Sequence, residues 1–188
     1  MTLARDAGHD VTAVSRSGDD VDGVREVRGD ASDAAIAREA VAGADAVVVT
    51  VGGSKENPRA RTEVTRTIVE AMREAGVERL VIQTSLGAGD SASQLPWLQR
   101  RIAPKLLAGP LADHDAQEDV VHASGLRWTI VRPAGLTNKA GTGRWQARRS
   151  DEPGSVGGTI ARADVAACLL SAITDDATVG AQLGISGA

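Results

Sequence analysis

The feature that most constrains the fold is a regular alternation of short, strongly apolar runs with longer segments of helical periodicity. Near-continuous apolar runs are typical of strands that are covered on both faces, as in a parallel sheet. The order strand, helix, strand, helix predicts βαβ units and a doubly wound α/β sheet. The predicted strands cover residues 11–14, 24–27, 44–51, 79–84 and 128–131.

Helical periodicity occupies the segments between these strands. In the segment 64–75, apolar residues recur at i, i+4, i+7, i+8 and i+11, and Gly76 is predicted to end the helix. A shorter helix over 36–41 has Ser32 or Asp33 as its predicted cap. The other predicted helices cover residues 112–123 and 165–173.

Composition narrows the class of protein. With 188 residues, 42% hydrophobic and 24% charged, the chain is expected to form one globular domain over 1–188. The single cysteine, Cys168, excludes an internal disulfide and favours the cytoplasm, and one cysteine with three scattered histidines disfavours a metal site. A net charge of −4 gives no reason to expect a nucleic-acid partner. The longest apolar run, 44–51, is too short to span a membrane.

The first residues have the pattern of a helix end. Leu3, Ala4 and Ala7, followed by Gly8, lead directly into the strand at 11–14. In a doubly wound fold this helix follows a first strand and a glycine-rich phosphate turn, and neither precedes it here. We therefore expect a sheet without its usual first strand, dinucleotide binding that is weak or absent, and difficulty in folding.

Six segments occur in the order and spacing of one known family. They are 8–16, 29–30, 44–49, 84–87, 124–133 and 163–166. On these residues the chain resembles an atypical short-chain dehydrogenase/reductase of the NAD(P)H-binding, NmrA-like and flavin-reductase-like group, along essentially its whole length. The resemblance implies a Rossmann-like fold that lacks the family's first strand and glycine-rich loop.

The resemblance implies a cofactor site, and the end of the strand at 11–14 suggests which cofactor. An acidic residue at this place would hold the ribose hydroxyls of NAD. Here Ser15 and Arg16 follow, and a guanidinium can pair with the 2′-phosphate of NADP, so the residues favour NADP over NAD. The alternative is a solvated arginine at a strand end.

Further cofactor-binding candidates follow the next two strands. Asp30, with Ala31 beside it, resembles the family's carboxylate near the adenine, although it could equally cap the following helix. Val51, Gly52 and Gly53 end the 44–51 run, where glycines let the backbone approach a nucleotide or form an ordinary turn.

The candidates near the reacting centre lie later in the chain. Thr84 and Ser85 end a strand where relatives place an active-site serine, which could bond a carbonyl or the nicotinamide ribose. Pro133 precedes the loop that closes over the nicotinamide in the family. The structural alternatives are that Ser85 belongs to an ordinary turn after its strand and that Pro133 only ends its strand.

The family's usual tyrosine and lysine are replaced. The corresponding positions are Pro110 and His114, and the chain contains no tyrosine, which excludes that mechanism. Relatives that reduce flavins work without the tyrosine, and His114 is similarly placed to a histidine in them. A helix-start histidine solvated between Asp113 and Asp115 is the alternative.

Two functions from different classes remain. The first is an NAD(P)H-dependent oxidoreductase that passes hydride to a flavin, a quinone or a similar planar small molecule. The second is a non-catalytic NAD(P)-binding redox sensor of the NmrA-like type, or an inactive truncated copy. A serine hydrolase is rejected because Gln83 stands where a nucleophile elbow requires glycine.

Overall fold

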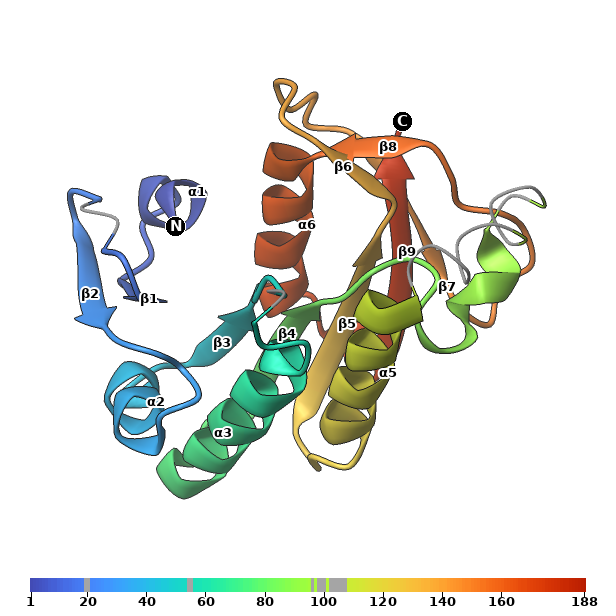
Figure 1. Ribbon diagram of the computed structural model, residues 1–188. Helices are drawn as coiled ribbons and strands as arrows, with labels where there is room; N and C mark the ends of the chain where they lie inside the picture. The colour runs from blue at the N-terminus through green and yellow to red at the C-terminus, as the bar shows by residue number, and fades with distance from the viewer. Residues whose placement is uncertain (19–20, 54–55, 96, 98–100, 102–107) are drawn as a thin grey trace.

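The computed structural model describes residues 1–18, 21–53, 56–95, 97, 101 and 108–188, in which strands and helices alternate along most of the chain (Figure 1). The strands are β1 (Val11–Ser15), β2 (Val24–Arg28), β3 (Ala46–Val49), β4 (Arg79–Gln83), β5 (Arg127–Pro133), β6 (Gly135–Thr137), β7 (Trp145–Arg149), β8 (Thr159–Ala161) and β9 (Ala181–Gly187). The helices are α1 (Thr2–Asp6), α2 (Ala34–Val41), α3 (Ala60–Ala75), α5 (Ala108–His122) and α6 (Arg162–Thr174), with 3-10 turns η1 (Gly89–Gln94) and η2 (Asp176–Thr178).

The largest sheet has the order β3-β4-β5-β9-β7. Its strands are parallel except β7, which runs antiparallel to β9. Helices α3 and α5 cover one face and α6 covers the other (Figure 1). This arrangement confirms the predicted doubly wound, Rossmann-like α/β fold.

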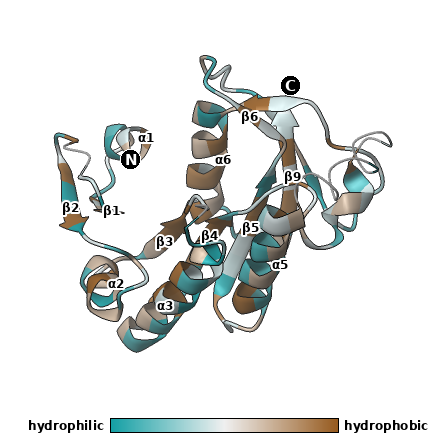
Figure 2. Ribbon diagram, in the orientation of Figure 1, coloured by the Kyte–Doolittle hydropathy of each residue, from teal (hydrophilic) through white to brown (hydrophobic). Residues whose placement is uncertain are grey.

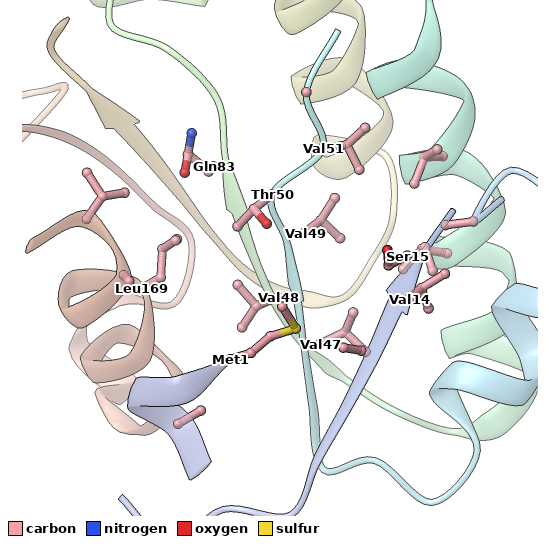
Figure 3. Close-up of a pocket in the computed structure, with 18 of the residues that line it drawn as sticks. Met1, Val14, Ser15, Val47, Val48, Val49, Thr50, Val51, Gln83 and Leu169 are labelled. Atoms are coloured by element: carbon pink, nitrogen blue, oxygen red, sulfur yellow. The ribbon is translucent and has the colours of Figure 1, made fainter. Parts of the chain in front are cut away.

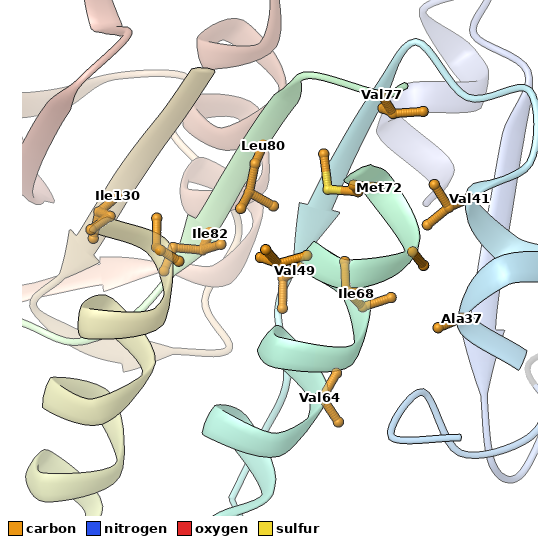
Figure 4. Packing of buried hydrophobic residues seen from close by; sticks show 13 residues of the cluster. Ala37, Val41, Val49, Val64, Ile68, Met72, Val77, Leu80, Ile82 and Ile130 are labelled. Atoms are coloured by element: carbon orange, nitrogen blue, oxygen red, sulfur yellow. The ribbon is translucent and has the colours of Figure 1, made fainter. Parts of the chain in front are cut away.

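Burial of the central strands explains their continuous apolar runs. Leu80 and Ile82 of β4 pack among α2, α3 and α5, as Figure 4 shows, whereas Val81 points to the opposite face and packs with α6. Successive side chains of a strand alternate between faces, so a strand covered on both sides needs apolar residues at every position. Hydrophobic residues accordingly follow β3, β4 and β9 in Figure 2.

Two helix ends match their sequence signals. Gly76 ends α3 in the left-handed conformation, with φ of 71°, which glycine adopts without a side-chain clash. Asp33 caps α2 by accepting a hydrogen bond from the backbone N–H of Ala35. Of the two predicted N-cap residues of α2, Ser32 and Asp33, Asp33 is therefore the one that caps the helix.

Strands β1 and β2 form a separate parallel pair. Within the described ranges β1 pairs only with β2, and β3 is the end strand of the large sheet. The facing edges of β1 and β3 are thus separated, and no strand of the described residues lies between them.

Four strands were not predicted, β6 to β9. The segment Trp145–Arg149, which no predicted strand covers, is strand β7 and pairs with β9. Its two arginines, Arg148 and Arg149, obscure the strand pattern, and β9 contains two glycines, which lower its strand propensity. The α5 helix also begins at Ala108, four residues before its predicted start. Among the described helices, none is both long and apolar enough to cross a lipid bilayer.

Candidate functional site

A cavity of about 2640 Å³ opens between the β1–β2 pair, β3 and α6 and extends to the carboxyl ends of β4 and β5. Doubly wound folds place their ligands at the carboxyl ends of the strands. Figure 3 shows Ser15, Val51 and Gln83 near strand ends around this space, with Met1 and Leu169 deeper in the gap. All predicted site residues line the cavity: Ser15, Arg16, Asp30, Ala31, Val51, Gly52, Gly53, Thr84, Ser85, His114 and Pro133.

At the β1 end, the candidate nucleotide-binding residues are joined by local contacts. The Ser15 hydroxyl accepts a hydrogen bond of 3.0 Å from the backbone N–H of Gly18, which fixes the turn after β1. Arg16 is exposed, and its positive charge contributes to lowering the pKa of Asp30. Arg16 and Asp30 therefore lie at one end of the cavity, as the resemblance implies.

Asp30 forms a turn of its own rather than a helix cap. Its Oδ1 accepts hydrogen bonds from the backbone N–H and the hydroxyl of Ser32, at 2.9 and 2.7 Å. These bonds, with a smaller contribution from Arg16, hold the pKa of Asp30 below its ordinary value against a small opposing effect of burial. The capping alternative is wrong, because Asp33 has that role.

The β3 exit is shaped by a side chain that the sequence analysis did not identify. A Cβ at Gly53 would lie 2.3 Å from Nη1 of Arg61, so the guanidinium fills the space that any larger residue would need. Arg61 comes from the first turn of α3, and its Nε is buried without a partner among the described residues. Gly52, by contrast, has open space around it.

His114 is buried, with 7% of its surface exposed, so the solvated alternative is wrong. Its Nδ1 lies 3.2 Å from Oε1 of Gln117, whose Nε2 donates to Thr65. Because Gln117 presents its oxygen, Nδ1 carries the proton and Nε2 is the basic nitrogen. Nε2 has no hydrogen-bond partner in the part of the chain that the structure describes.

Two causes keep the imidazole of His114 neutral. Burial is the larger cause, and the positive charge of Arg61 adds to it, so the pKa of His114 lies below its ordinary value. The hydrogen bond to Gln117 and the charges of Asp113 and Glu118 oppose this shift without reversing it. At pH 7 His114, which lines the cavity, is therefore neutral and has one unprotonated ring nitrogen.

Asp113, the neighbour of His114, has turned away from it. Its carboxylate accepts hydrogen bonds from the backbone N–H groups of Arg61 and Thr62 and from the Thr62 hydroxyl, so it caps α3 from a different helix. Burial disfavours its charge, yet these bonds outweigh that cost and lower the pKa of Asp113. This contact fixes α5, and hence His114, against the start of α3.

The β4 exit carries Thr84 and Ser85. The Thr84 hydroxyl points inward and donates to Oε1 of Glu118 at 2.7 Å. Ser85 is half-buried, and its hydroxyl makes only a long bond of 3.3 Å to the carbonyl of Leu86. Pro133 is buried at the end of β5, where its carbonyl accepts from the N–H of Leu86. Ser85 is therefore the residue of this group whose hydroxyl is most available to a ligand.

Asp164, in the first turn of α6, contacts the loop that precedes β7. It accepts hydrogen bonds from the backbone N–H groups of Thr142 and Gly143, at 2.9 and 2.8 Å, and from the Thr142 hydroxyl. These bonds, opposed by burial, lower its pKa. Asp164 thus ties the loop before β7 to the start of α6.

The residues around the cavity fit a dinucleotide. Arg16 supplies an exposed cation at one end, Gly52 leaves its backbone open, and Ser85 and His114 offer a hydroxyl and a basic nitrogen at the other end. Sequence reasoning did not identify Arg61, Gln117 or Glu118. A signal was present for two of them, because Gln117 and Glu118 follow His114 by three and four residues on the same helix face.

Comparison with known proteins identifies the family of the chain. The family model described as NAD(P)H-binding matches residues 1–176. The uncharacterized sugar epimerase YhfK of Bacillus subtilis (strain 168) is 29% identical over 144 residues, which cover 74% of this chain and 61% of that protein. The match thus spans less than two thirds of the length of this curated relative.

Solved structures share the fold. ChuY, described as an anaerobillin reductase from Escherichia coli O157:H7, has a TM-score of 0.81 and 27% identity, covering 99% of this chain and 88% of its own. The oxidoreductase ylbE from Lactococcus lactis has a TM-score of 0.80 and 18% identity, and the match covers 100% of this chain and 85% of ylbE. A short-chain dehydrogenase/reductase from Veillonella parvula DSM 2008, solved in complex with NADP, has a TM-score of 0.74 and 17% identity. That match covers 89% of this chain and 74% of the other.

Proposed function

Since the chain belongs to the NAD(P)H-binding family, we propose that it is an NADPH-dependent oxidoreductase that reduces a planar, conjugated small molecule such as a flavin or a quinone. The observation that carries the proposal is the cavity that joins Arg16 at one end to Ser85 and His114 at the other. The description of ChuY as a reductase favours the same class of reaction.

Arg16 and Ser15 are the residues that would select NADP over NAD. A guanidinium can pair bidentately with a 2′-phosphate, and the NAD-selecting carboxylate is absent from this strand end. Asp30 and Ala31 would contact the adenine, and the backbone of Val51, Gly52 and Gly53 would follow the ribose and phosphates.

Residues at the other end would orient the nicotinamide and the acceptor. When bound, NADPH supplies a hydride. The Ser85 hydroxyl would donate to a carbonyl oxygen of the acceptor, with Pro133 and Thr84 shaping the wall around it. His114 is neutral, so its Nε2 would accept a hydrogen bond from an N–H or O–H group and hold the acceptor in one orientation.

A redox sensor is the second candidate, and one observation favours it. The chain has no tyrosine, and the neutral His114 is a poor proton donor at pH 7. A sensor would bind NADPH without oxidising it. Consumption of NADPH with flavin mononucleotide or menadione distinguishes the two functions, because turnover supports the enzyme and binding alone supports the sensor.

The cofactor preference is tested by titrating NADPH and NADH against the wild type and Arg16→Ala. We expect the variant to lose NADPH affinity selectively, by about 1.5–3 kcal/mol for a charge-assisted hydrogen bond. Arg38→Ala is the matched control, since Arg38 is an exposed arginine of α2 that pairs with Glu74. Equal losses for both cofactors in Arg16→Ala would show that Arg16 does not read the 2′-phosphate.

A further inference from the structure

A fully buried ion pair lies behind the loop that carries Ser85. Arg132 of β5 and Glu118 of α5 have side chains that are 1% and 2% exposed. Nε of Arg132 donates to Oε1 of Glu118 at 2.9 Å, and Nη2 donates to Oε2 at 2.6 Å. The contact is therefore bidentate, which fixes the orientation of both groups.

Both ends of the loop 84–89 rest on this pair. At the first end, the Thr84 hydroxyl donates to Oε1 of Glu118 at 2.7 Å. At the second end, Gly89 has φ of +55°, and a Cβ there would lie 2.6 Å from Nη2 of Arg132 and 2.7 Å from Oε2 of Glu118. The loop backbone therefore approaches the ion pair as closely as glycine allows.

Further bonds tie the same loop to its surroundings. Nη1 of Arg132 donates to Oδ1 of Asp90 at 2.5 Å and to the Ser150 hydroxyl at 3.1 Å. The N–H of Gly89 donates to Oδ1 of Asp115 at 2.7 Å. Arg132 thus joins the exit of β4 to the residue after β7, while α5 holds the loop through two carboxylates.

Stability alone is a weak reason for such a pair. Replacing a buried ion pair by apolar side chains of similar volume is often neutral or stabilising, because two charges no longer have to be removed from water. Apolar side chains, however, cannot accept the hydrogen bond of Thr84. The property that only the charged pair supplies is the fixed position of the loop.

We propose that Arg132 and Glu118 are positioning residues that hold the loop 84–89, and with it the Ser85 hydroxyl, against the acceptor end of the cavity. The proposal rests on the proposed reductase function for its kinetic consequence. Its structural part, that the pair orders this loop, stands independently of that function.

The test replaces the pair by apolar residues in Glu118→Leu/Arg132→Met. We expect a folded protein in which kcat for NADPH oxidation falls by about 100-fold, as for a misplaced reacting group, with little change in the Kd for NADPH. Hydrogen exchange of the amides in 84–89 should accelerate, while that of β4 stays slow. Thr84→Val removes only the loop's bond to Glu118 and should lower kcat by a smaller factor. This variant keeps the proposal testable if the double variant fails to fold.

The matched control is Arg79→Met. Arg79 is also a buried arginine, but it lies at the opposite end of β4 and bonds the carbonyls of Arg127 and Ile173. Its loss should lower Tm and leave kcat at low temperature and exchange in 84–89 unchanged. Glu118→Gln, which keeps an oxygen for Thr84, should lose less kcat than the double variant.

Two results would overturn the proposal. One is a double variant with wild-type kcat and wild-type exchange in 84–89. The other is a loss of kcat that follows Tm equally in the double variant and in Arg79→Met. If the wild type oxidises no NADPH, the reductase function fails, and the exchange measurement alone then decides whether the pair orders the loop.

Discussion

The two ends of the fold differ in how completely their strands are covered. In β4 the residues from Arg79 to Ile82 are all buried, because neighbours lie on both edges and helices on both faces. In β1 no residue is fully buried, and Val48 of β3 is 39% exposed. The difference lies in their neighbours, because no strand of the described residues pairs with the facing edges of β1 and β3. Pairing of both edges and coverage of both faces make a strand more stable than an edge strand with an exposed face.

The largest effect is expected from pairing the facing edges of β1 and β3. A fused N-terminal extension of about 20 residues, designed as a strand, a glycine-containing turn and half a helix, would pair them. Each hydrogen bond formed at these open edges contributes about 0.5–1.5 kcal/mol net, so several of them are comparable to a whole stability margin of about 5–15 kcal/mol. We expect a higher Tm and tighter NADPH binding. The same extension with prolines in its strand should give neither, and equal behaviour of all three proteins would contradict the comparison.

The second prediction compares two carboxylates that cap helices. Asp113 is buried and caps α3 across the helix interface, with Arg61 beside it, whereas Asp33 caps α2 in an exposed turn. Asp113→Ala should lower the free energy of unfolding by about 3 kcal/mol, because it leaves a buried partner uncompensated. Asp33→Ala should cost about 1 kcal/mol. Urea unfolding measures both, and equal costs would show that the two regions are equally ordered.

The third prediction uses two valines that face each other in the sheet. Val48 of β3 and Val81 of β4 are register partners, yet Val81 is fully buried. Val81→Ala removes the same atoms as Val48→Ala, but it leaves a cavity. We therefore expect the free energy of unfolding to fall by about 2 kcal/mol for Val81→Ala and by at most about 0.5 kcal/mol for Val48→Ala. A large cost for Val48→Ala in urea unfolding would mean that the β1 side of β3 is covered in solution.

The smallest effect is a pH dependence from His114. The pKa of His114 is lowered in the folded state, so below its ordinary value of about 6.5 the unfolded chain binds a proton that the folded chain does not. The free energy of unfolding should therefore decrease as the pH falls from about 6.5 toward the folded pKa, and be constant above that window. His114→Asn should remove this part of the dependence. His122→Asn, at the exposed end of the same helix, should retain it.

Much of the architecture followed from pattern alone. The runs at 79–84 and 128–131 are strands of the sheet, the helix predicted over 64–75 lies within α3 and ends at Gly76, and the doubly wound arrangement is confirmed. These elements are buried on both faces or have one long apolar stripe, so their local sequence and their final environment agree. The candidate site residues also lie around one cavity, because strand ends in such a fold converge on one edge.

Tertiary structure alone decided the rest. Strand β9 has weak propensity and becomes a strand because β5 and β7 supply partners on both sides. His114 lies between two acidic residues in the sequence, yet it is buried because Asp113 turns to the start of α3. Glu118 and Arg132 are 14 residues apart and meet only when α5 packs on β5. A sequence determines the period and the polarity of its elements, whereas the partner of a buried charge depends on which elements the fold brings together.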